Sequence, residues 1–361
     1  VSVLREEDTV ARFGGDEFVV VLPKVSTLQS VKSVANTLLE QIKQSYNIDE
    51  HELIITGSIG ISIYPDNASS ADVLIQHADS AMYKAKEQGR NNSKFYTAQI
   101  NEEINRRLTL EKALRRAIEL EQFILLYQPK VDLDTDIVTG MEALIRWQHP
   151  ELGLISPVEF IPLAEETGVI LEIGDWVMST ACAQMKLWEQ QFPQLKNMSI
   201  NVSPRQFWQS DFISKVIQIF SESNVSVENI EFELTEGIVM KDADVAISMM
   251  KSLKYLGVSL SIDDFGTGYS SLSYLQNLPV DILKIDRSFV NDLVDEQSDS
   301  AIIRSIIALA NNFDLEVVAE GIEEEYQKEI LSTLGCKYGQ GYYFSRPLET
   351  DAMTALLEQQ K

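Results

Sequence analysis

Apolar runs of strand length alternate with helical stretches through residues 121–361, and this alternation limits the possible folds more than any other feature. Strands that alternate with helices of this length form parallel βαβ units. Many such units in succession favour a closed (β/α)-barrel over an open sheet. The predicted strands of these units are 198–202, 230–234, 258–262, 282–285, 315–319 and 338–344.

Two segments lead into these units. Residues 123–131 and 137–144 form a predicted antiparallel hairpin, which departs from an ideal barrel of parallel strands. Residues 97–120 carry apolar side chains at helical spacing between glutamates and arginines. This pattern predicts an amphipathic linker helix that leads into the barrel.

Residues 1–96 show the pattern of a short α/β domain. Strands are predicted at 18–22 and 53–64, and helices at 28–45 and 71–88. We therefore expect three parts, with bounds of 1–96, 97–120 and 121–361.

Composition excludes several classes of protein. The chain has 30 basic and 55 acidic residues, a net charge of −25, which argues against a general nucleic-acid surface. Its two cysteines, Cys182 and Cys336, lie far apart, so a disulfide framework is not expected and a reducing compartment fits better. No apolar run approaches the roughly 18 residues that span a bilayer. We expect a cytoplasmic protein with no membrane contact in this segment. Because Val1 opens in the middle of a pattern, we also expect it to be part of a longer chain.

Polar residues end the predicted strands in successive units. The carboxyl ends of barrel strands converge on one mouth, so these side chains are expected to meet there. A crowded group of carboxylates suits Mg²⁺ or Mn²⁺, and adjacent aspartates could bridge two such ions. The alternative is that each acidic residue is a helix cap or a solvated loop residue. The residues are Glu142, Asn201, Glu233, Asp263, Asp264, Lys284, Asp286 and Glu320.

Eight ordered blocks across residues 105–355 resemble the EAL family. The blocks are EALIRW at 142–147, PVEFIPLAE at 157–165, NVS at 201–203, ELTE at 233–236, DDFGTG at 263–268, LKID at 283–286, AEGIE at 319–323 and QGY at 340–342. The resemblance implies an EAL-type (β/α)8 TIM-like barrel with one antiparallel strand. It also implies metal-dependent hydrolysis of the bacterial second messenger cyclic di-GMP to linear pGpG.

The resemblance assigns roles to individual positions. It implies that Lys284, Glu320 and Glu236 take part in catalysis, with Glu236 pinning the loop 264–271. Gln128, Arg146 and Gln340 match positions near the substrate. The resemblance implies two Mg²⁺ or Mn²⁺ ions, with the ligands Glu142, Asn201, Glu233, Asp263, Asp264, Asp286 and Glu320. Because no catalytic position departs from the family pattern, we favour an active enzyme over the alternative, a catalytically silent cyclic di-GMP receptor.

The first part resembles the GGDEF domain of diguanylate cyclases, on the sequence RFGGDEF at 12–18 and a second block at 78–91. The resemblance implies a nucleotide site that could take GTP. Its implied residues are Gly14, Gly15, Asp16, Lys86 and Arg90, with Arg5 and Asp8 in an RxxD inhibitory pattern.

Two further expectations come from the same resemblance. The family's first strand lies upstream of its signature, and Val1 begins too late to include it. We therefore expect a partial GGDEF domain without cyclase activity in these 361 residues. We also expect a homodimer formed through barrel helices, with the 97–120 helix as a lever.

Overall fold

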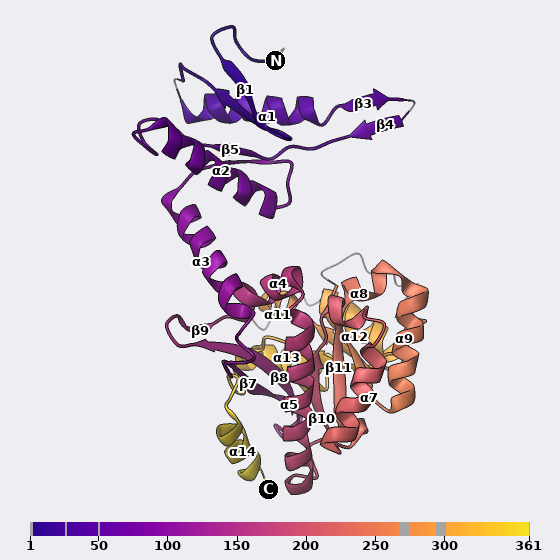
Figure 1. Cartoon of the computed structure of the whole chain (residues 1–361). Helices are drawn as coiled ribbons and strands as arrows, with labels where there is room; N and C mark the ends of the chain where they lie inside the picture. Colours follow the sequence, from indigo (N-terminus) through magenta and orange to yellow (C-terminus); the bar gives the residue numbers. More distant parts are fainter. Residues whose placement is uncertain (1–2, 26, 50, 267–274, 294–300, 361) are drawn as a thin grey trace. The chain divides into compact units, whose positions relative to one another are not determined.

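The computed structural model describes residues 3–25, 27–49, 51–266, 275–293 and 301–360 (Figure 1). The chain divides into two compact units, Val1–Leu110 and Glu111–Lys361. Helix α3 (Ala98–Leu114) crosses the division, and every other helix and strand belongs to one unit.

The first unit has two main helices and three two-stranded sheets. Helix α1 (Leu28–Ile42) begins at Thr27, whose side chain accepts a hydrogen bond from the Ser30 amide at 3.2 Å. Helix α2 (Ala71–Glu87) packs directly on strand β5 at Gly60, which has no side chain. A Cβ at this position would lie only 1.8 Å from the Ala78 carbonyl oxygen. The sheets pair β1 (Thr9–Gly14) with β2 (Glu17–Val21), β3 (Ser45–Ile48) with β4 (His51–Ile54), and β5 (Ile59–Ile61) with β6 (Ser93–Phe95).

Two sequence predictions for this region need correction. The predicted strand 53–64 is divided between β4 and β5, which belong to different sheets. The predicted helix 97–120 is shorter: α3 covers Ala98–Leu114, and turns follow as far as Glu121. Glu121 has a positive φ of 52°, which a continuing helix does not allow.

The second unit is built around a closed barrel of eight strands. The barrel closes where β10 pairs with β8, and β9 (Gly153–Ile155) extends the sheet outside it. Strand β7 runs antiparallel to both neighbours, β8 and β15, and the other pairs within the barrel are parallel. The outer strand β9 pairs antiparallel with β8. The predicted barrel with one antiparallel strand is therefore confirmed. The eight strands are β7 (Phe123–Asp132), β8 (Val138–His149), β10 (Asn197–Asn201), β11 (Ile230–Thr235), β12 (Ser259–Phe265), β13 (Ile282–Ile285), β14 (Glu316–Ala319) and β15 (Tyr338–Gly339).

Helices surround this barrel, with α5, α7 and α9 on one side of it (Figure 1). Helices α5, α9 and α12 contact β10, β12 and β14. Their apolar faces are buried, as at Met185, Met250 and Ile307. Within the described residues of this unit, the helices are α4 (Pro157–Thr167), α5 (Ile170–Gln191), α6 (Pro204–Phe207), α7 (Phe212–Ser223), α8 (Glu236–Lys241), α9 (Ala243–Leu256), α11 (Arg287–Asn291), α12 (Ala301–Asn312), α13 (Glu325–Thr333) and α14 (Thr350–Glu358), with the short 3₁₀ helix η1 (Val227–Asn229).

The last barrel strand is much shorter than predicted. Residues 338–344 were expected to form one strand, but β15 ends at Gly339. The chain then passes close to the loop that follows β14, where a Cβ on Gly341 would lie 2.0 Å from the Ile322 carbonyl oxygen. This close approach needs glycine at position 341, and it turns the chain directly after Gln340.

Candidate metal centre at the barrel mouth

The carboxyl ends of the parallel strands bring together polar side chains from distant parts of the sequence. Glu233 lies in β11, Asp263 near the end of β12 and Glu320 directly after β14. Parallel register aligns these strands, with Thr235 beside Asp263 and Ile285 beside Ala319. The mouth therefore gathers the side chains that the sequence placed at the strand ends.

Lys284 lies at the centre of this group. Its ammonium nitrogen is 2.6 Å from Glu233 Oε2, 2.5 Å from Glu320 Oε1 and 3.2 Å from Asp263 Oδ1. Glu142 Oε2 is 4.0 Å away. The Lys284 side chain is 1% exposed, so water screens these interactions little. One buried cation thus faces four carboxylates from four different strands or the residues directly after them.

Two amides hold the Glu142 carboxylate. Asn201 Nδ2 donates to Glu142 Oε1 at 2.6 Å, and Gln340 Nε2 donates to Oε2 at 2.7 Å. Since the amide nitrogen of Asn201 donates to Glu142, the amide oxygen is the Asn201 atom that could bind a cation. The Gln340 nitrogen also donates to Gln128 Oε1 at 3.1 Å, so both predicted substrate-binding glutamines lie beside the carboxylate group.

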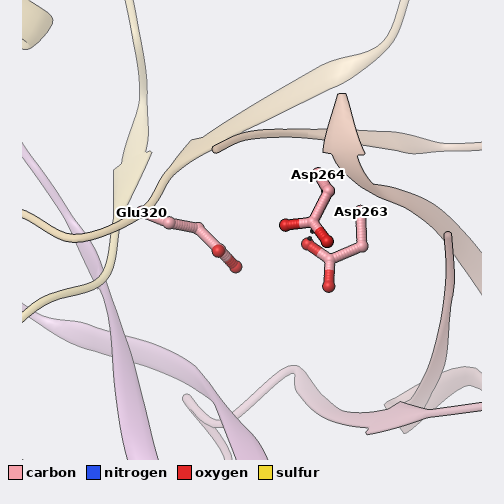
Figure 2. A group of neighbouring side chains, drawn as sticks. All are labelled: Asp263, Asp264 and Glu320. Atoms are coloured by element: carbon pink, nitrogen blue, oxygen red, sulfur yellow. Dashed lines mark hydrogen bonds between the residues drawn. The ribbon is translucent and has the colours of Figure 1, made fainter. Parts of the chain in front are cut away.

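Asp263, Asp264 and Glu320 form the tightest oxygen cluster. Each offers one carboxylate oxygen, and these three oxygens lie within 4.8 Å of one another. Figure 2 shows the two aspartates side by side, with Glu320 directed toward them from another strand end. Neighbours in an extended strand point to opposite faces. Asp264 instead has a φ of 54°, and its amide donates to Asp263 Oδ1 at 3.0 Å. This turn brings two consecutive carboxylates to the same side.

Burial and mutual repulsion make several of these carboxyls hard to ionise. Burial, with repulsion from neighbouring carboxylates, raises the pKa of Glu320 to about 8, of Glu142 to about 7 and of Asp264 to about 6. Burial also opposes ionisation of Glu233, but Lys284 and Lys130 outweigh it and lower its pKa to about 2. Lys284 alone therefore does not neutralise the mouth.

The donor set fits a hard divalent cation. Carboxylate and amide oxygens are the ligands that Mg²⁺ and Mn²⁺ prefer. The raised pKa values of Glu320 and Asp264 show that the ionised carboxylates are disfavoured without a cation, and a bound cation would stabilise them. Asp263, Asp264 and Glu320 would hold such an ion, with Glu142, Asn201 and Glu233 as further ligands.

We expect the metal-free protein to lose stability between pH 4.5 and 8, the range from the ordinary glutamate pKa to that of Glu320. In this range the folded state keeps protons on Glu142 and Glu320 that the unfolded state has released. Stability therefore falls as pH rises. In EDTA, the melting temperature should be lower at pH 8 than at pH 4.5 by about 5 °C or more. In Mg²⁺, this difference between the two pH values should be smaller. A melting temperature that stays level in EDTA would contradict the charge assignment.

Two predicted site residues have a different local setting. Asp286 caps α11 by accepting from the Ser288 amide at 2.9 Å, and its side chain also hydrogen-bonds with Asp264. It therefore combines the helix-cap role with a place beside the aspartate pair. Glu236 begins α8, and its two buried carboxylate oxygens have no hydrogen-bond partner within the described residues. The predicted loop 264–271 lies outside those residues from position 267 onward.

Arg146 lies on β8 with Glu142, four residues farther along. Its NH1 donates to the Ile145 carbonyl at 2.8 Å, and burial lowers the pKa of the guanidinium. In the described part of the chain, no hydrogen bond joins it to Gln128 or Gln340. Its role toward substrate stays a prediction.

The predicted nucleotide-binding residues of the first unit lie in three separate groups. Arg5 and Asp8 form a turn, in which the Arg5 amide donates to Asp8 Oδ2 at 2.8 Å. Gly14, Gly15 and Asp16 lie at the turn between β1 and β2, and Gly15 has a φ of 49°. Lys86 and Arg90 lie at the end of α2. Among the described residues, no hydrogen bond or ion pair connects these three groups.

Sequence reasoning missed Lys130. This residue lies on β7, is 2% exposed, and forms ion pairs with Glu231 and Glu233 at 3.0 Å each. Its signal was present: Lys130 follows Gln128 by two positions, so both share one face of the strand. A lysine in a largely apolar strand points to a buried partner.

Comparisons with known proteins agree with this arrangement. Residues 111–347 match the model of the EAL domain, and residues 1–92 match that of the diguanylate cyclase GGDEF domain. A solved structure of the PaMucR phosphodiesterase in complex with c-di-GMP is 43% identical, with a TM-score of 0.66. The match covers 68% of this chain and 99% of that structure.

Longer relatives match nearly the whole chain. MucR of Pseudomonas aeruginosa, named a bifunctional diguanylate cyclase/cyclic di-GMP phosphodiesterase, is 42% identical over 98% of this chain and 51% of its own length. PdeR of Escherichia coli, named a cyclic di-GMP phosphodiesterase, is 35% identical over 96% of this chain and 52% of its own length. The chain thus spans about half the length of these relatives. No helix among the described residues has the length and hydropathy needed to cross a membrane. On the match of residues 111–347 and the solved relative, the chain belongs to the EAL domain family.

Proposed function

We propose that this chain is a phosphodiesterase that hydrolyses cyclic di-GMP to linear pGpG and depends on two Mg²⁺ or Mn²⁺ ions. The observation that supports it most is Lys284, buried among the carboxylates of Glu233, Asp263 and Glu320. Relatives named as cyclic di-GMP phosphodiesterases supply the substrate class.

The proposed reaction adds one water across a phosphodiester bond. The water oxygen bonds to phosphorus, the bond from phosphorus to the ribose 3′-oxygen breaks, and that oxygen takes up a proton. Bound divalent cations would lower the pKa of the water and offset charge on the phosphoryl oxygens. Glu320 is the carboxylate proposed to accept the water's proton.

Other side chains would bind and orient the substrate. Lys284 supplies a fixed positive charge near the phosphoryl oxygens, where negative charge increases during the reaction. Arg146 can form a forked pair with a phosphate, and Gln128 and Gln340 can hydrogen-bond to guanine edges or phosphate. Glu236, with its buried carboxylate, is proposed to hold the loop that follows Asp264.

Chromatography of cyclic di-GMP incubated with the protein tests the proposal. We expect pGpG with Mg²⁺ or Mn²⁺, none with excess EDTA, and renewed product when metal is restored. Bound but unconverted cyclic di-GMP would instead identify a silent receptor. If the protein neither binds cyclic di-GMP nor forms product, the substrate assignment is wrong.

The proposal extends to two partners. GTP binding by residues 1–96 is supported by the GGDEF match and by the Gly14-Gly15 turn. Homodimerisation through barrel helices is supported by the family alone. Titration with GTP tests the first, and light scattering tests the second. A fully active monomer at all concentrations would exclude an essential dimer.

A further inference from the structure

A second buried lysine lies below the mouth of the barrel. Lys130 projects from β7, and its side chain is 3% exposed. An ammonium group has three N–H donors, and Lys130 has a partner for each. It donates to the Ser199 hydroxyl, to Glu231 Oε1 at 3.0 Å and to Glu233 Oε1 at 3.0 Å. Its hydrogen-bonding capacity is therefore fully used.

Glu233 is held between two lysines. Its Oε1 accepts from Lys130 at 3.0 Å, and its Oε2 accepts from Lys284 at 2.6 Å. The Glu233 side chain is 0% exposed, so water makes no contribution to its orientation. Lys284 lies among the mouth carboxylates, whereas Lys130 reaches the mouth only through Glu233 in the described part of the chain. Lys130 thus fixes the carboxylate from the side opposite the other acids.

The groups around Lys130 make this position rigid. Glu231 Oε2 accepts from Asn197 Nδ2 at 2.9 Å. The Asn197 amide occupies the space over Gly140, where a Cβ would lie 1.8 Å from its Oδ1 atom. Gly140 is also the register partner of Lys130 on β8. The glycine makes room for the amide, the amide holds Glu231, and Glu231 holds Lys130.

We propose that Lys130 is a positioning residue for the metal centre: it fixes the orientation of Glu233, so that this carboxylate is ready to bind the cation. The inference rests on the proposed metal-dependent function. Partners of metal ligands typically change metal affinity about 10–100-fold when they are removed. Nothing in the sequence motifs assigned a role to this lysine.

The competing explanation is purely structural, with Lys130 needed only to neutralise Glu231 inside the barrel. Removing Lys130 alone cannot separate the two, because it leaves two buried carboxylates short of a cation, a change that destabilises strongly. The double variant Lys130→Met with Glu231→Met removes one charge of each sign and keeps apolar volume. The Lys130–Glu231 ion pair is then removed without leaving Glu231 as an unpaired buried charge. Glu233 keeps its Lys284 contact but loses its contact with Lys130.

The test is Mn²⁺ titration followed by electron paramagnetic resonance, without nucleotide, together with the melting temperature in EDTA. We expect the double variant to keep a melting temperature near wild type but to bind Mn²⁺ about tenfold more weakly or worse. Glu231→Gln is the matched control, since it leaves Lys130 on Glu233, and we expect its Mn²⁺ affinity to stay within about threefold of wild type.

Each outcome decides between the explanations. A double variant that binds Mn²⁺ like wild type overturns the proposal. So does equal weakening in Glu231→Gln. If the double variant does not fold, Lys130→Gln with Glu231→Gln takes its place with the same expectation. If neither double variant folds, the role of Lys130 is structural and the proposal is wrong. Wild-type protein that neither binds Mn²⁺ nor forms pGpG would refute the proposed function instead.

Discussion

Lys284→Met is expected to lower kcat for cyclic di-GMP by about 10³-fold, the largest effect of any single lysine change in the chain. The substitution keeps an unbranched side chain one heavy atom shorter than lysine. It removes the charge that, among the described residues, contacts Glu233, Glu320 and Asp263 together. The proposed stabilisation of the phosphoryl oxygens is lost with it. Product formation at saturating substrate and metal measures the effect.

Lys215→Met is the matched control for this variant. Lys215 pairs with Asp175 at 3.0 Å on the helical surface, and its side chain is 35% exposed. Such pairs contribute little to stability, so kcat should stay near wild type. A Lys284→Met protein that melts cooperatively and turns over at a near-normal rate would remove Lys284 from the mechanism.

Asp263→Asn is expected to weaken Mn²⁺ binding by about 100-fold or more and to abolish most turnover. Asp263 belongs to the tight oxygen cluster with Asp264 and Glu320, and it also contacts Lys284. Asparagine keeps the shape and can still accept from the Asp264 amide, so the change isolates the charge. Calorimetric titration with Mn²⁺ measures binding independently of turnover.

Asp175→Asn provides the comparison for Asp263→Asn. It removes an aspartate charge from the partly exposed pair with Lys215, which lies between the outer helices α5 and α7. Metal affinity and turnover should both match wild type. Unchanged Mn²⁺ affinity in Asp263→Asn would show that the cation binds elsewhere.

The sequence allowed prediction of the barrel and of which acids meet at its mouth, because both follow from periodic patterns. Glu233, Asp263 and Glu320 each end an apolar strand, and parallel register then requires their convergence. Lengths were predicted less well. Helix α3 ends at Leu114 and strand β15 at Gly339, where backbone turns and close packing override local propensity.

What could not be predicted depends on contacts between distant segments. The positive φ of Asp264 sets two neighbouring carboxylates side by side, and no local pattern announces it. The contacts of Lys130 join β7 to β10 and β11, which are remote in sequence. Glu236 illustrates a third case, since its predicted role concerns a loop that lies mostly outside the described residues.

The reversed direction of β7 determines where the polypeptide enters the barrel. In a barrel of parallel strands, the chain enters each strand at the end away from the ligand. Phe123 instead pairs with Trp147, near the carboxyl end of β8, so the chain enters β7 on the ligand side. Gln122 lies just before Phe123. Its side-chain Oε1 accepts a hydrogen bond from Trp147 Nε1 at 2.9 Å, and its backbone carbonyl accepts one from the Gln148 amide. A displacement of the residues that lead into β7 would therefore first move the part of β8 that carries Arg146.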